Sequence, residues 1–231
     1  MDEVTEQRLG GGQTRGIVRI GGTVRRPLHG RSEFVHAVLR HLEQVRFEGT
    51  PRFLGSDEQG REMLTFIEGE VVAWSPDELS DARVRSAVEF VRRFHDAMAD
   101  SGLTDGEEIV CHHDLGAHST VFRGDTAVGL IDWNEHVAPG PRLFDLADTC
   151  WSFADVAGGK LSIAEQARRV ALICDTYGWD DRHAVVNEIA RRIRSALDDH
   201  ARHGRTGAVA VFRRYDDWMG DHAHSLKASL E

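Results

Sequence analysis

The sequence predicts an α+β fold of two lobes, a small N-terminal antiparallel β lobe and a larger, mostly helical C-terminal lobe. Short β-type runs bounded by turns fill much of residues 17–67, and helical patterns of apolar residues fill most of residues 77–222. A short connector at residues 68–70 separates the two regions. We therefore expect domains at residues 1–69 and 70–231, with a cleft where they meet.

The composition is that of a globular protein with a sizeable core. The chain has 231 residues, and 41% of them are hydrophobic. Lys and Arg number 28 against 38 Asp and Glu, a net charge of −10 without a basic block, which argues against a nucleic-acid-binding protein. The acidity suits a cationic partner, although solubility alone also explains it.

The cysteines and the apolar runs indicate where the protein resides. Cys111, Cys150 and Cys174 have neither metal-type nor disulfide-framework spacing, and each lies in an apolar context. The N-terminal stretch MDEVTEQRLGGG is acidic without an apolar core, and no run approaches the ~18–20 apolar residues of a membrane helix. We expect a cytoplasmic protein with reduced thiols and no membrane contact, as a monomer or homodimer.

The small lobe begins with a glycine-rich stretch that includes Gly11 and Gly12. The runs 17–20 and 23–27 follow and predict a β-hairpin around the Gly21-Gly22 turn. Glycines let a backbone approach phosphate closely. A flexible lead-in fits the same glycines, and no P-loop or dinucleotide-binding fingerprint decides between the two readings.

The remaining elements follow from apolar periodicity. Ser32–Val45 predicts a helix with Ser32 as its N-cap, and residues 51–55 and 62–67 predict two more strands. We expect five helices in the large lobe: Asp77–Met98, Leu143–Phe153, Ser162–Tyr177, Arg182–His200 and Val209–His222.

The centre of the chain carries two aspartates at the ends of apolar strands. Residues 109–111, 120–122 and 128–131 read as short strands, with Asp114 after the first and Asp132 after the last. The pairing of such strands brings carboxylates that are eighteen positions apart onto neighbouring loop ends. Loops on a rigid sheet commonly carry catalytic groups.

Three motifs follow one another here, HHD at 112–114, IDW at 131–133 and GPRLFDLAD at 140–148. They resemble the catalytic core of aminoglycoside phosphotransferases and related small-molecule kinases, such as choline and homoserine kinases. The resemblance is specific over residues 109–151. It implies a protein-kinase-like fold that binds ATP, or another NTP, with Mg²⁺ in the cleft and phosphorylates a hydroxyl of a small molecule.

The resemblance also implies the roles of four central residues. Asp114 would be the base that accepts the hydroxyl proton, and Asp132 would hold Mg²⁺. His112 would hold the catalytic loop. The family's loop asparagine falls here on Ser119, which we expect to reach the metal through a bridging water.

Nucleotide contacts are implied at three places. A cation on the third strand would meet the phosphates, as a lysine does in kinases, and here it is an arginine whose acidic partner could be Glu33 or Glu43. The residues implied are Gly11 and Gly12 in the glycine-rich loop, Arg25 or Arg26 on the strand, and Thr65, Phe66 and Ile67 at the adenine-binding hinge.

Several other readings stay open at this point. The family's loop asparagine is replaced by Ser119, and the third strand carries arginine where kinases have a lysine. Both departures favour a catalytically impaired nucleotide- or ligand-binding pseudokinase as the alternative function. A protein kinase fits the sequence less well. His112, His113 and His118 invite a zinc site, but a second ligand pair at structural spacing is missing. We expect Asp145 to brace its own helix and support the loop only indirectly, His95 to be a helix-terminal histidine, and Trp133 and Trp151 to serve packing.

A cationic or polyhydroxylated acceptor would sit against acidic residues of the helical lobe. The candidates are Asp145, Asp148, Asp155, Asp198, Asp199, Asp216, Asp217 and Asp221.

Overall fold

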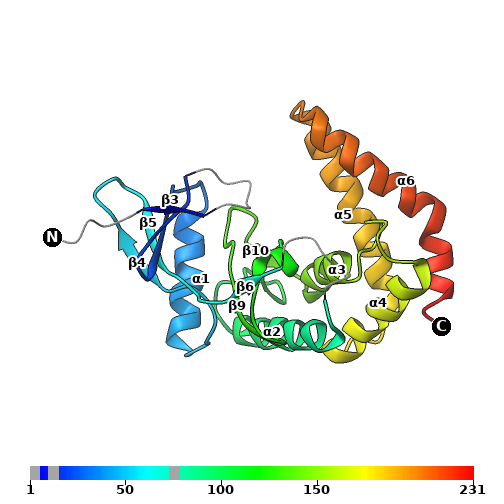
Figure 1. The fold of residues 1–231 in the computed structure, drawn as a ribbon, viewed down its shortest axis with the longest axis horizontal. Coiled ribbons are helices and arrows are strands. Elements are labelled where there is room, and N and C mark those ends of the chain that lie inside the picture. The colour runs from blue at the N-terminus through cyan, green and yellow to red at the C-terminus, as the bar shows by residue number, and fades with distance from the viewer. Residues whose placement is uncertain (1–5, 10–15, 73–78) are drawn as a thin grey trace.

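The computed structural model describes residues 6–9, 16–72 and 79–231. A small lobe of strands and one helix lies at one end of the molecule, and a larger helical lobe extends from it (Figure 1). The elements of the small lobe are β1 (Gln7–Arg8), β2 (Val18–Ile20), β3 (Thr23–Arg26), α1 (Ser32–Gln44), β4 (Phe53–Ser56) and β5 (Glu62–Thr65).

The strands of the small lobe form an antiparallel sheet in the order β1-β2-β3-β5-β4. Gly21, with φ +57°, makes the tight turn between β2 and β3. The pairing of β3 with β5 places Arg26 opposite Glu62. Because successive side chains of a strand alternate between its faces, Arg25 and Arg26 point in opposite directions.

The larger lobe combines short strands with long helices, and β6 pairs with β8, β8 with β9, and β7 with β10. Its last two helices form a hairpin that projects from the body (Figure 1). The elements are β6 (Glu70–Val71), α2 (Asp81–Ala99), β7 (Ile109–Cys111), the 3-10 turn η2 (Ala117–Ser119), β8 (Thr120–Arg123), β9 (Thr126–Leu130), β10 (Ala138–Gly140), α3 (Arg142–Phe153), α4 (Ile163–Tyr177), α5 (Arg182–Arg202) and α6 (Thr206–Ala228).

Helix α2 fixes the strands that lead to the two aspartates. Ser80 caps its start by accepting a hydrogen bond from the Arg83 backbone, and its apolar face packs on β7, β9 and α4. Phe94 of α2 is fully buried and meets Trp133 edge to face at 5.4 Å. Burial of such a side chain stabilises the fold by about 1.5–3 kcal/mol. The segment after β9 is therefore anchored in the core.

The predicted α+β, two-lobed architecture is confirmed, and the differences lie at element ends. Helix α2 starts at Asp81, while the predicted start at Asp77 lies outside the described residues. Helix α6 is longer than predicted at both ends. Strands β1, β6 and β10 have two or three residues each, too few to show a period in sequence. The domain boundary at residues 69 and 70 stays a prediction.

Two composition-based expectations can be compared with the structure. Cys111, Cys150 and Cys174 are all buried free thiols, as predicted. Across the described helices, none combines the length and apolar character that a bilayer crossing requires.

Candidate active site

The loops that carry Asp114 and Asp132 are tied together by direct hydrogen bonds. The backbone N–H of Ile131, at the end of β9, donates to the Ser119 carbonyl at 2.9 Å. The His112 Nε2–H donates to the Ile131 carbonyl, also at 2.9 Å. This contact fixes the tautomer of His112, whose pKa is lowered because its ring is completely buried. The predicted role of His112 as a loop-holding residue agrees with this geometry.

Both carboxylate oxygens of Asp114 have a side-chain partner. His118 Nε2 lies 3.1 Å from Oδ1, and Asn134 Nδ2 lies 3.2 Å from Oδ2. Asn134 Oδ1 accepts the His136 backbone N–H at 2.9 Å, which leaves its amide nitrogen to face Asp114. Burial opposes ionisation of Asp114, but the hydrogen bond from His118 and the positive electrostatic influence of His118, His112 and His136 together outweigh it and lower the pKa of Asp114. The carboxylate is therefore ionised at neutral pH and partly open to solvent.

Asp132 presents a carboxylate that the described part of the protein leaves without a hydrogen bond or ion pair. Its backbone is left-handed, with φ +63°, and Trp133 beside it is buried and donates from its indole Nε1 to the Leu130 carbonyl. Burial raises the pKa of Asp132. A half-buried carboxylate without a protein partner suits a bound cation.

The oxygen-rich surroundings fit Mg²⁺ better than zinc. Mg²⁺ commonly takes one or two protein carboxylates together with water and phosphate oxygens, so a single carboxylate such as that of Asp132 could serve as its protein ligand. Asn134, two residues later, is an amide that could join it. Within the described ranges, no group of three or more His, Cys, Asp or Glu side chains is arranged to bind a metal ion.

The structure contradicts the expectation that Ser119 faces a metal. Its side chain is completely buried, and its hydroxyl donates to the Asp114 carbonyl at 2.8 Å and accepts the Gly116 N–H at 3.0 Å. The hydroxyl is used to close the loop around Asp114. Because the Ser119 side chain has no exposed surface, a larger asparagine side chain at this position would require the turn to adjust.

Asp145 supports the catalytic loop directly, so the expectation of an indirect role was wrong. Its fully buried carboxylate accepts the backbone N–H groups of His112 and His113, each at 2.7 Å. His95 Nε2 lies 3.0 Å from Asp145, and its Nδ1 lies 2.6 Å from the Tyr177 hydroxyl. Burial would raise the pKa of Asp145, but the hydrogen bond with His95 and the electrostatic influence of His95, His113 and His112 together outweigh it and hold the pKa well below its usual range. His95 is thus a buried link in the core and not a helix-terminal histidine.

Arg26 connects the small lobe to the Asp132 loop. Its Nε lies 2.6 Å from Glu62, and its Nη2 donates to the Trp133 carbonyl. His36 of α1 completes the group by contacting the other Glu62 oxygen at 2.7 Å. The partner of the arginine is therefore Glu62 of β5, and the suggestion of Glu33 or Glu43 was wrong.

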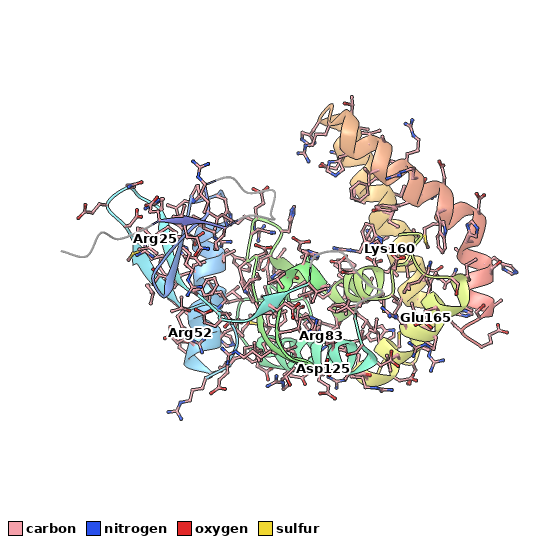
Figure 2. The ribbon with its side chains drawn as sticks, viewed as in Figure 1. Arg25, Arg52, Arg83, Asp125, Lys160 and Glu165 are labelled. Carbon is pink, nitrogen blue, oxygen red and sulfur yellow. The ribbon has the colours of Figure 1, made fainter. Side chains whose placement is uncertain are left out.

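Arg25 lies on the other face of β3 and is bound there. Its Nη1 contacts the Thr23 hydroxyl at 2.5 Å, and its Nε is 3.7 Å from Asp57. Figure 2 shows Arg25 among the strands of the small lobe. Of the two arginines, Arg26 is the one placed beside the Asp132 loop.

Of the three residues predicted at the hinge, two use their backbone N–H groups within the described part of the protein. Thr65 N–H donates to the Arg52 carbonyl at 3.0 Å, and Phe66 N–H donates to the Gly22 carbonyl at 2.8 Å. In the described part of the chain, Ile67 N–H has no such acceptor. Gly11 and Gly12 lie outside the described residues.

The acidic residues expected to receive a cation are largely occupied by internal partners. Asp148 is held by Arg192 through two contacts of 2.6 Å, and Asp155 accepts the backbone N–H groups of Lys160 and Leu161 at 2.6 and 2.9 Å. On the α5–α6 hairpin, Asp199 pairs with Arg202, His203 and Arg205, and Asp216 pairs with Arg194. These pairings weaken the prediction of a cationic acceptor.

Sequence reasoning missed the two residues that hold the Asp114 carboxylate. His118 was considered only as a zinc ligand, and Asn134 was not considered. Both lie close in sequence to predicted site residues, four positions after Asp114 and two after Asp132. A search for amides or histidines beside each aspartate would have found them.

Comparison with known proteins decides the family. Residues 7–185 match the model of the phosphotransferase enzyme family, more than half of the chain. The chain belongs to this family. This membership confirms the predicted small-molecule phosphotransferase and the kinase-like fold, and the two-carboxylate site lies within the matched residues.

The family relatives differ in what their names describe. The trifolitoxin immunity protein of Rhizobium leguminosarum bv. trifolii is 33% identical over an alignment of 259 residues that covers 96% of this chain and 97% of the relative. The gentamicin complex of the aminoglycoside phosphotransferase APH(2″)-IIa is similar in fold, with a TM-score of 0.64 and 11% identity, covering 91% of this chain and 90% of that one.

A second solved structure, a choline/ethanolamine kinase family protein from Mesorhizobium loti, has a TM-score of 0.54 and 19% identity. The match covers 98% of this chain and 92% of that chain. At these identities the two solved structures support the fold. They leave the acceptor of this chain open.

Proposed function

We propose that this phosphotransferase transfers the γ-phosphoryl group of ATP, or of another NTP, to a hydroxyl of a small molecule. One observation carries the proposal: Asp114 is ionised, partly open to solvent and held at both oxygens, on a loop tied to that of Asp132. An ionised, positioned carboxylate is what a proton-accepting base requires. Solved relatives with bound GDP and ADP support a nucleotide as the phosphoryl donor.

Each residue then has a role in the transfer. The acceptor O–H gives its proton to Asp114 while the acceptor oxygen bonds to the γ-phosphorus. The bond from that phosphorus to the β–γ bridging oxygen breaks, and the nucleoside diphosphate leaves. Asp132, with Asn134 beside it, would hold Mg²⁺, which neutralises phosphate charge when it is bound. Arg26 would contact the phosphates from the small lobe, and Ile67 N–H would contact the base at the hinge.

The test is nucleotide consumption coupled to acceptor phosphorylation. Purified protein with ATP or GTP and Mg²⁺ is offered a panel of amino alcohols, sugars, hydroxy acids and aminoglycosides, and diphosphate release and ³¹P spectra are recorded. We expect at least one acceptor to yield a phosphate ester in step with diphosphate. Tight Mg²⁺-dependent nucleotide binding with no ester from any acceptor class would favour the pseudokinase instead.

A further inference from the structure

The acceptor side of the site can be located from the geometry of the transfer. In-line displacement places the attacking oxygen and the leaving group on opposite sides of the phosphorus. Arg26 and the hinge put the nucleotide on the side of the small lobe, so an acceptor approaches Asp114 from the side of α3 and α5. Asp148 of α3 lies near the Asp114 loop, because Arg192, which contacts both Asp148 oxygens, also lies beside His113, the residue before Asp114.

Arg192 of α5 covers Asp148 there. Its Nε and Nη2 contact the two Asp148 oxygens at 2.6 Å each, and its Nη1 lies 3.4 Å from Nδ1 of His113, the residue before Asp114. The Arg192 side chain is 18% exposed against 9% for Asp148. The Arg192 side chain is thus the more exposed member of the pair.

Arg192 still has hydrogen-bonding capacity after this pairing. A guanidinium carries five N–H donors, and the Asp148 contacts come from only two of its three nitrogens. The third nitrogen, Nη1, makes one long contact, with a histidine whose pKa burial lowers to about 4. The N–H groups of the guanidinium that remain unused suit a carboxylate or another oxygen-rich group, because a guanidinium binds such groups in a planar, directional manner.

We propose that Arg192 is a specificity-determining residue that binds an anionic group, such as a carboxylate, of the hydroxyl-bearing acceptor and disfavours polycationic acceptors. The inference rests on the proposed function, because it assumes that an acceptor binds beside Asp114. A polycation would find Asp148 occupied and Asp145 enclosed by loop backbone. The preferred substrate class is therefore a hydroxy acid or a hydroxylated molecule with a carboxylate, and not an aminoglycoside.

The experiment compares ligands of matched shape and different charge. Binding of glucuronate, glucose, glucosamine and gentamicin to the full chain is measured by saturation-transfer NMR, with and without a non-hydrolysable ATP analogue. Diphosphate release with each compound is measured separately. We expect the wild-type protein to bind glucuronate about tenfold more tightly than glucosamine, and gentamicin no better than glucosamine.

Two variants and one control assign the preference to Arg192. Arg192→Gln should remove the advantage of glucuronate. Because that change leaves Asp148 buried without its partner and could weaken folding, the double variant Asp148→Asn with Arg192→Gln keeps a neutral hydrogen-bonding pair and should lose the advantage too. Arg194→Gln, on the same helix and paired with Asp216, should retain it.

The outcomes separate this inference from the proposed function. Glucuronate binding no tighter than glucosamine binding, or an advantage that survives in both Arg192 variants, would overturn the role of Arg192. Failure of every acceptor to give diphosphate, with the charge preference present in binding, would count against phosphoryl transfer while supporting Arg192 as an anion-binding residue.

Discussion

Asn134 donates a hydrogen bond from Nδ2 to Oδ2 of Asp114 over 3.2 Å, and so links two loop ends that are twenty positions apart in sequence. The contact places an amide beside the carboxylate of the proposed base, although the usual loop position of the family asparagine holds Ser119. The amide comes from the segment after Asp132. One residue thus connects the proposed base to the proposed metal ligand.

Asn134→Leu should therefore lower kcat about tenfold or more, because Asp114 loses a charge-assisted hydrogen bond that orients it. The nucleotide KM should change little. Asn187→Leu is the matched control, since Asn187 is an exposed asparagine of α5 whose side chain contacts Lys227 of α6. Equal kcat for the two variants would show that Asn134 does not position the base.

Asp132 and Ser119 should differ sharply in a Mg²⁺ titration at fixed nucleotide. Asp132→Ala should abolish Mg²⁺-dependent nucleotide binding, because its carboxylate, which has no hydrogen-bond partner among the described residues, is the expected ligand. Ser119→Ala should lower kcat but leave the Mg²⁺ midpoint in place, because the buried hydroxyl binds loop backbone. Ser119→Asn should damage the loop. A shifted midpoint in Ser119→Ala would restore the serine as a ligand.

Glu62→Gln should weaken both stability and nucleotide binding. It leaves Arg26 buried without its ion-pair partner, which costs about 3 kcal/mol. The displaced guanidinium should raise the nucleotide KM more than it lowers kcat. Glu58→Gln in the exposed turn before β5 is the control for denaturant unfolding and for kinetics. A nucleotide KM that stays at the wild-type value in Glu62→Gln would argue against Arg26 as a phosphate contact.

The pairing of Arg26 with Glu62 could not be predicted from the sequence. The alternation of residues in both strands was readable, but the register that sets Arg26 opposite Glu62 depends on how the strands align in space. Helix α1 contains two glutamates at plausible positions, Glu33 and Glu43, and so drew attention away from β5. In the structure, α1 contributes to this group through His36, which contacts Glu62.

The central loops were better predicted because their signals are local. Each aspartate follows its own apolar strand, and the motifs around Asp114 and Asp132 are contiguous in sequence. Asp145 was misjudged because its partners are the backbone N–H groups of His112 and His113, more than thirty positions earlier. Backbone donors carry no sequence signature, so such a contact can be found only once the chain is folded.

Asp145→Asn should reduce the free energy of unfolding at pH 7 by about 3 kcal/mol, because a buried charge with three donors is replaced by an amide. The pKa of Asp145 is lowered on folding from its usual ~3.9, so its ionisation stabilises the fold above that pH and the stabilisation is lost as pH falls. The difference in the free energy of unfolding between the wild-type protein and the variant should become smaller below about pH 4. A difference in the free energy of unfolding that stays constant from pH 7 to pH 3, measured by urea unfolding, would contradict this account.

The most direct test of phosphoryl transfer by Asp114 is single-turnover formation of the phosphate ester by Asp114→Asn and by Asp125→Asn. Asp125 lies at the turn between β8 and β9, where it pairs with Arg83 (Figure 2). Loss of the base should slow ester formation about 10²–10⁴-fold in Asp114→Asn with nucleotide affinity retained, while Asp125→Asn should match the wild-type protein. Ester formation at the wild-type rate by Asp114→Asn would contradict the assignment of the base.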